Sequence, residues 1–176
     1  MFRLSLFVCV VACCLVSRPS FADVHRLQEG DVAPDWMMTD IEGHNYSLYQ
    51  ELNSGRQVVM VFWSTWCKFC KVMLPEMNLF KQSLDDDTRI FALNIWESGD
   101  PVAYFDTRNI DIPLMLRADD IADRYNIDST PGLVFIGTDK RIRYIRGNRE
   151  NLSDTMRHLQ LLVIKDRVKH AATSGG

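Results

Sequence analysis

The feature that most constrains this chain is a pair of cysteines, Cys67 and Cys70, placed between an apolar run and an amphipathic segment. Residues 58–63 read Val-Val-Met-Val-Phe-Trp, which is typical of a strand buried on both faces. From Cys70 onward, apolar residues recur at helical spacing, and Pro75 is expected to kink that helix. The two thiols are therefore predicted to lie where a buried strand meets the start of a helix.

The remaining chain alternates between predicted strands and helices. This order predicts one α/β domain over residues 23–170, with a central mixed sheet flanked by helices. Residues 171–176 are small and polar, and we expect a disordered tail there. We expect a hairpin over 35–48 with Gly43 in its turn, strands at 89–95, 114–116, 133–136 and 141–146, helices at 100–108 and 119–125, and a last helix with an apolar stripe at Leu152, Met156, Leu159 and Val163.

The N-terminus has the pattern of a signal peptide. Arg3 precedes an apolar run over 4–16, and Ser20-Phe21-Ala22 offers a cleavage site before Asp23. The run is shorter than the roughly 20 residues of a membrane span. An uncleaved anchor and lipidation at Cys13 are the alternatives. We therefore expect a periplasmic or otherwise exported protein, either soluble or membrane-anchored.

The cysteine count favours redox chemistry. Of 5 cysteines, only Cys67 and Cys70 lie outside the predicted leader, and so close a pair cannot close a long stabilising loop. Zinc and copper sites usually need further ligands, and none of the 4 histidines lies near the pair in sequence. We expect no bound metal or cofactor, and a copper-binding chaperone is the alternative from another class. With a net charge of −3 and no clustered basic segment, a nucleic-acid partner is not expected.

The position of the pair also assigns roles to the two thiols. A thiol at a helix N-terminus meets unpaired backbone N–H groups and the positive end of the helix dipole, which favour the thiolate. Lys68 and Lys71 add positive charge. Cys67 is therefore predicted to be the exposed nucleophile, and Cys70 the buried thiol that resolves the mixed disulfide.

Residues 61–70 resemble the strand and W-C-x-x-C loop of the thioredoxin superfamily, with Pro75 at the position of the family's helix kink. Thr130-Pro131, just before a predicted strand, resembles the family's cis-proline loop; an ordinary loop proline is the alternative. Such a bend can place a backbone edge beside the cysteines, where an extended substrate could add as a strand. Trp63 is expected in the core. The residues predicted to contact substrate are Trp66, Lys68, Phe69, Thr130 and Pro131.

Residues 30–36 further resemble the G-x-x-A-P-x-F entry of the periplasmic TlpA/ResA-like (DsbE/CcmG-like) branch, and residues 100–116 resemble its central insertion. The resemblance covers roughly residues 28–165. It implies a thioredoxin fold and a thiol–disulfide oxidoreductase that reduces client proteins, such as the haem-binding cysteine pair of an apocytochrome c. It also implies a membrane thiol as electron donor. We expect a monomer.

Glu97 is a third candidate catalytic residue. Val61 stands where thioredoxin has a buried acid, and the branch often has an acidic residue at the position of Glu97. Burial is expected to raise the pKa of Glu97, so that it accepts a proton from Cys70. A solvated residue at a strand end is the alternative.

The residues between the cysteines leave the direction of electron flow open. Many relatives have Glu-Pro there, whereas this chain has Lys68-Phe69. Replacing an acid with a cation stabilises the Cys67 thiolate and makes the disulfide more oxidising. The resemblance therefore implies a reductant, while these two residues favour a disulfide oxidase or isomerase.

Overall fold

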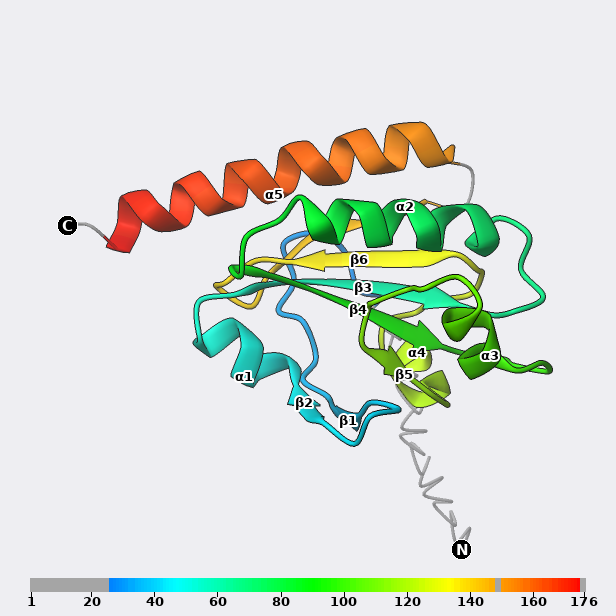
Figure 1. The fold of residues 1–176 in the computed structure, drawn as a ribbon. Coiled ribbons are helices and arrows are strands. Elements are labelled where there is room, and N and C mark those ends of the chain that lie inside the picture. Colours follow the sequence, from blue (N-terminus) through cyan, green and yellow to red (C-terminus); the bar gives the residue numbers. More distant parts are fainter. Residues whose placement is uncertain (1–25, 148–149, 175–176) are drawn as a thin grey trace, which may run out of the picture.

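The computed structural model describes residues 26–147 and 150–174, so the predicted leader, its cleavage site and Cys13 lie outside the described residues. A five-stranded sheet with the strand order β5-β4-β3-β6-β7 forms the centre (Figure 1). Strands β4 and β5 run parallel to β3, β6 is antiparallel to β3, and β7 is antiparallel to β6. The strands are β3 (Gln57–Trp63), β4 (Thr88–Asn94), β5 (Leu114–Met115), β6 (Gly132–Ile136) and β7 (Ile142–Ile145).

Strand β3 explains the continuous apolar run in the sequence. All of its residues are buried, because the strand lies at the middle of the sheet with helices on both faces. Its side chains alternate between two hydrophobic cores. Val59, Val61 and Trp63 belong to one core, and Val58, Met60 and Phe62 belong to the other.

Helices cover both faces of the sheet. Figure 1 shows α2 (Cys70–Gln82) and α5 (Leu152–Ser174) over one face, and α1 (Leu48–Asn53) with the hairpin of β1 (Met37–Thr39) and β2 (Asn45–Ser47) over the other. The core on the α2 side also contains residues of α3 (Pro101–Asp106), and the opposite core contains residues of α4 (Asp119–Arg124). This is the mixed sheet flanked by helices that the sequence predicts.

Two helical segments differ from the prediction. Helix α1 was not predicted; it begins after Ser47, whose hydroxyl accepts a hydrogen bond from the N–H of Gln50, and this is the usual N-terminal cap. Helix α5 continues to Ser174, so the prediction of a disordered tail is wrong for residues 171–174. The reason is local: Ala171 and Ala172 are strong helix formers, and residues 152–174 contain no glycine or proline.

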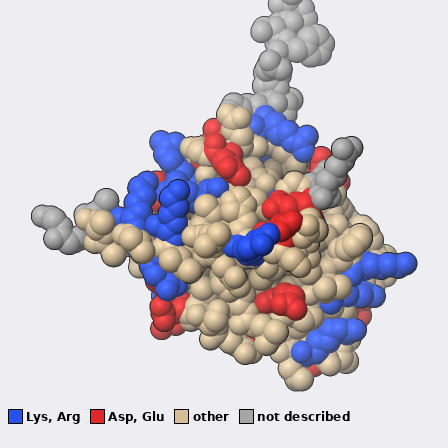
Figure 2. Space-filling view, turned by 90° about the horizontal axis from the view of Figure 1, so that it is seen from above, with Lys and Arg blue, Asp and Glu red and all other residues tan. Residues whose placement is uncertain are grey.

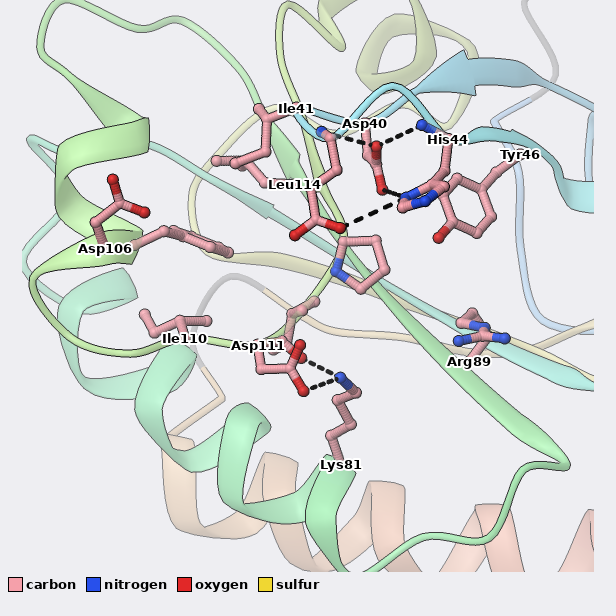
Figure 3. Close-up of a pocket in the computed structure, with 14 residues that line it drawn as sticks. Asp40, Ile41, His44, Tyr46, Lys81, Arg89, Asp106, Ile110, Asp111 and Leu114 are labelled. Carbon is pink, nitrogen blue, oxygen red and sulfur yellow. Dashed lines mark hydrogen bonds and ion pairs between the residues drawn. The ribbon is translucent and has the colours of Figure 1, made fainter.

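The β1–β2 hairpin is closed by Asp40 (Figure 3). Its carboxylate accepts hydrogen bonds from the backbone N–H groups of Glu42 and His44 at 2.9 and 2.8 Å, and it contacts the His44 ring at 3.2 Å. Burial alone would raise the pKa of Asp40, but these hydrogen bonds lower it. Gly43 occupies the left-handed region at φ +89°. A hollow of about 240 Å³ beside this turn is lined by neither cysteine.

The outer face of α5 exposes apolar side chains on the side opposite the hairpin. Leu161, Ile164 and Val168 are each more than half exposed. Figure 2 looks down on this side, where basic and acidic side chains are scattered over the centre and the edge of an otherwise uncharged surface. Within the described part of the chain, no helix is both long and apolar enough to cross a membrane.

Candidate active site

Cys67 and Cys70 form a disulfide in the turn that joins β3 to α2, with their Cα atoms 5.3 Å apart. Cys70 is the first residue of α2, and its backbone N–H donates a hydrogen bond to Cys67 Sγ at 3.1 Å. This N–H is one of the donors that a helix leaves unpaired at its N-terminus. When the disulfide is reduced, such a donor and the helix dipole favour a thiolate on Cys67 over a thiol.

Cys67 is less accessible than the sequence predicts, whereas Cys70 is buried as predicted. Cys67 is only 4% exposed and Cys70 is fully buried. The prediction of an exposed Cys67 is therefore wrong for the disulfide form, because the residue packs into the same core as Trp63 and Met73. The relative order is as predicted, since Cys67 is the more accessible of the two.

The aromatic side chains near the two cysteines are buried or exposed as the sequence predicts. Trp63 is buried in the core, whereas Trp66 and Phe69 are 51% and 75% exposed. Lys68 and Lys71 are exposed on either side of Cys70. The first turn of α2 is Cys70-Lys71-Val72-Met73, so the charge beside the disulfide is positive.

The Thr130–Pro131 peptide bond is cis. Pro131 directly precedes β6, and the pairing of Phe62 with Gly132 brings it next to the end of β3. A hollow of about 320 Å³ lies between this bend and the cysteine loop, lined by Phe69, Met73, Ser129, Thr130, Pro131, Arg146, Glu150 and Leu152. The fold thus brings together Phe69 and the Thr130-Pro131 segment, although Thr130 lies 61 positions after Phe69 in the sequence.

Arg146 supports the proline bend and was not identified from the sequence. Its guanidinium donates to the carbonyl of Pro131 at 2.9 Å, to the carbonyl of Glu150 at 2.5 Å and to Thr155 Oγ1 at 3.2 Å. The side chain therefore ties the bend to the beginning of α5. No sequence motif marks it, because its partners come from two separate segments, the proline bend and the beginning of α5.

The backbone beside the bend tolerates little additional volume. A Cβ atom on Gly132 would lie 2.8 Å from Ile127 Cγ2 and 3.2 Å from Phe62 Cβ. We expect Gly132→Ala to lower the free energy of unfolding by about 1 kcal/mol through overpacking, as measured by urea denaturation. Gly147→Ala is the matched control, since its Cβ would meet open space. An equal effect of both substitutions would contradict this account.

Glu97 follows β4, on the side of the cysteine loop opposite the proline bend. Its carboxylate accepts five hydrogen bonds. Its Oε1 accepts from Thr65 Oγ1 at 2.5 Å and from the N–H groups of Ser98 and Gly99 at 2.8 Å each. Its Oε2 accepts from the Thr65 N–H at 2.9 Å and from Asn94 Nδ2 at 2.6 Å. The carboxylate thus holds the segment that leads directly to Trp66 and Cys67.

The pKa of Glu97 is shifted in the direction opposite to the prediction. Burial would raise the pKa of Glu97, but the hydrogen bonds from Thr65, Asn94 and Gly99 outweigh burial and lower the pKa to about 2. The expectation of a raised pKa is therefore wrong in the disulfide form. The reason is that five donors converge on an ionised carboxylate.

A second residue that was assigned no role from the sequence is Trp96. It follows β4, is 38% exposed, and accepts a hydrogen bond at its carbonyl from Trp66 Nε1 at 2.7 Å. Its φ is +49°, a region that residues other than glycine rarely adopt. A bulky aromatic residue at a strand end is a sequence signal that could have identified it.

Comparison with solved structures agrees with this architecture. A putative thiol:disulfide interchange protein DsbE from Chlorobium tepidum superimposes with a TM-score of 0.70 at 18% identity, over 80% of this chain and 98% of that one. The exposed lipoprotein thioredoxin Etrx1 of Streptococcus pneumoniae gives 0.61 at 17% identity, over 72% and 98%. The fold is therefore the thioredoxin fold, with a redox-type cysteine pair at the start of its second helix.

Comparison with known sequences identifies the family and the type of protein. The profile of the AhpC/TSA family matches residues 30–145, and the chain belongs to this family. It is 29% identical to the thiol-disulfide oxidoreductase ResA of Geobacillus kaustophilus, over 80% of this chain and 81% of that protein. It is 31% identical to a ResA of Bacillus cereus, over 69% and 71%. The chain is thus a thiol–disulfide oxidoreductase of the ResA/DsbE type with the C-x-x-C pair Cys67–Cys70.

Proposed function

We propose that this protein reduces disulfides in exported client proteins, with Cys67 as the attacking thiolate and Cys70 as the resolving thiol. The observation that carries the proposal is the Cys67–Cys70 disulfide, whose Cys67 sulfur accepts a hydrogen bond from the first N–H of α2. Cys67 is the less buried of the two residues, and its thiolate is the form that the helix N-terminus stabilises.

The reaction is a two-step thiol–disulfide exchange. The Cys67 thiolate attacks one sulfur of the client disulfide, forming a mixed disulfide and releasing the client's other sulfur as a thiolate. The Cys70 thiolate then attacks Cys67 Sγ, forming the Cys67–Cys70 disulfide and releasing the second client thiolate. Two electrons pass to the client, and a thiol donor, which we propose to be membrane-bound, restores the dithiol.

The exposed groups around Cys67 are proposed to bind the client. Phe69 and the Thr130-Pro131 bend line one hollow beside the disulfide, and an extended client segment can pair with the backbone of such a bend. Trp66 and Lys68 are exposed at the opening of the cysteine loop. In this proposal Glu97 holds the loop in place through Thr65.

Export through residues 1–22 is part of the same proposal. One structural neighbour is described as an exposed lipoprotein, which agrees with the signal peptide pattern of this sequence. The resemblance to ResA also makes the cysteine pair of an apocytochrome c a proposed client class.

A disulfide oxidase is the second candidate, and a specific observation favours it. Lys68 and Lys71 flank Cys70, and the Cys70 N–H contacts Cys67 Sγ. Both features stabilise the Cys67 thiolate, and therefore the reduced form. By contrast, copper binding lacks such support. In the described ranges 26–147 and 150–174, the group of three or more side chains close enough to share an ion is Asp40, Glu42 and His44, which adds no third ligand to the two cysteines.

The reduction potential of the pair separates the two candidates. A reductant is expected to lie near the ~ −270 mV of thioredoxin, and an oxidant near the ~ −120 mV of DsbA. Equilibration with glutathione or dithiothreitol buffers measures the value. We expect a value on the reducing side of this range, and a lower potential still in Lys68→Glu, because an acid destabilises the Cys67 thiolate. Lys165→Glu, on the outer part of α5, is the control and is expected to leave the potential unchanged. A wild-type value near that of DsbA would replace the reductase proposal with the oxidase.

A further inference from the structure

Trp96 lies beside the cysteine loop because of the sheet order. Strands β3 and β4 are parallel neighbours, and Trp63 at the end of β3 pairs with Asn94 at the end of β4. The chain stays adjacent beyond the sheet, since the N–H of Ile95 donates to the carbonyl of Trp63 at 3.0 Å. The Trp66 indole then donates to the carbonyl of Trp96 at 2.7 Å. The residue before Cys67 is thus bonded directly to Trp96.

The backbone of Trp96 has an unfavourable conformation, and hydrogen bonds to its N–H and its carbonyl hold it there. Its φ of +49° lies in the left-handed region, which is sterically unfavourable for a residue other than glycine. Its N–H donates to Asp119 Oδ1 at 2.9 Å, and its carbonyl accepts from Trp66. The side chain is nevertheless 38% exposed. Glycine would adopt this backbone conformation without strain. Burial in the core does not explain why a tryptophan is present instead, because its side chain is partly exposed.

Trp96 and the proline bend flank the cysteine loop on opposite sides. Strand β3 has β4 on one side and β6 on the other. Trp96 follows β4, whereas Pro131 precedes β6. A client segment that pairs with the backbone at Pro131 therefore extends across Cys67 toward the side where Trp66 and Trp96 lie.

On the side of the cysteine loop where Trp66 and Trp96 lie, the surface available to a client is mainly aromatic. The carboxylates next to Trp96 are engaged, since Asp119 accepts the Trp96 N–H and Glu97 accepts the donors around Thr65. Trp66 is 51% exposed and Trp96 is 38% exposed. Indole rings contribute a large apolar area with little side-chain entropy to lose, and they favour contact with aromatic and aliphatic groups.

We propose that Trp96 determines client specificity, by contacting an apolar or aromatic side chain that flanks the attacked cysteine on the side away from Pro131. The inference rests on the proposed disulfide exchange with client proteins. Asp119 and Trp66 are positioning residues in this arrangement, because they hold the Trp96 backbone in the orientation that presents its ring. The preferred clients are segments in which a large apolar residue stands close to the cysteine.

The test compares disulfide-bonded peptides that differ only in having phenylalanine or serine beside the attacked cysteine. The reduced wild-type protein is expected to reduce the phenylalanine peptides faster. In Trp96→Gly this preference is expected to fall by about three- to tenfold, and Trp96→Phe is expected to retain most of it. The rate with bis(2-hydroxyethyl) disulfide, a small disulfide that carries no aromatic or large apolar group, is expected to be the same for all three proteins. Trp96→Gly should fold normally, because glycine adopts φ +49° without strain.

Leu161→Ala, which removes an exposed apolar side chain from the outer face of α5, is the matched control and is expected to leave the preference unchanged. An undiminished preference in Trp96→Gly would overturn the specificity role alone. A wild-type protein that reacts with the small disulfide but with no peptide would overturn the proposed function, and this inference with it.

Discussion

A Cys70→Ala variant is expected to accumulate mixed disulfides with its clients through Cys67, whereas a Cys67→Ser variant is expected to form none. The first change removes the thiol that resolves the intermediate, and the second removes the attacking thiolate. A serine hydroxyl is not ionised at neutral pH, so we expect Cys67→Ser to lower the exchange rate by about a thousandfold or more. Both side chains are small and lie at the start of α2, and both variants should retain the fold.

The measurement is non-reducing electrophoresis of tagged variants from exported cell fractions, followed by mass spectrometry of the adducts. Circular dichroism of both purified variants controls for folding. Adducts on Cys67→Ser but not on Cys70→Ala would reverse the two roles. If a folded Cys70→Ala variant traps no protein, exchange with protein clients is excluded.

Glu97→Gln is expected to lower the free energy of unfolding at pH 7 by about 2 kcal/mol, with the difference disappearing in acid. The folded-state pKa of Glu97 is about 2, against a usual value of 4.5. Since the shift is downward, the ionised carboxylate stabilises the folded protein above pH 4.5, and this contribution is lost as the pH falls toward 2. The full shift corresponds to roughly 3 kcal/mol, which we reduce because the side chain is partly exposed to solvent.

Urea denaturation of the wild type and the variant at several pH values measures this difference. Glu76→Gln, on the exposed part of α2, is the control and is expected to change stability by less than about 0.5 kcal/mol at any pH. A difference for Glu97→Gln that is the same at pH 7 and pH 2.5 would show that the carboxylate charge is not its source.

The same variant tests the proton transfer predicted from the sequence. If Glu97 accepts the Cys70 proton during exchange, Glu97→Gln should alter the titration of Cys70 and slow its attack on the mixed disulfide. If both are unchanged while stability falls, Glu97 acts by holding the loop through Thr65. The low pKa in the disulfide form favours this second result.

Much of the fold could be predicted because its signals are local. The apolar run of β3, the helical spacing after Cys70, and the glycine turn of the β1–β2 hairpin each reflect the periodicity or the backbone preference of a few neighbouring residues. Helix α1 has only 6 residues, too few for a clear helical period. The equally short α3 was predicted because Asp100-Pro101 marks its start, and α1 has no proline there. The extent of α5 was underestimated because its apolar stripe weakens before its helix-forming residues end.

Only the part of the site that is close together in the sequence could be predicted. Cys67 and Cys70 are close in sequence, so their spacing alone indicates exchange chemistry. The position of Phe69 beside Pro131, by contrast, depends on the antiparallel pairing of β3 with β6. Arg146 and Trp96 owe their roles to hydrogen bonds with segments that are distant along the chain.

By itself, the sequence determined that this chain has a single close pair of thiols beyond residue 22, placed at the start of a helix after a buried strand, and therefore a redox site. Only the tertiary structure decided how that site is arranged. It buries Cys67, lowers the pKa of Glu97, and places Trp96 beside the cysteine loop. The physical reason is that burial and pKa depend on every group that surrounds an atom in space, and most of those groups come from elsewhere in the chain.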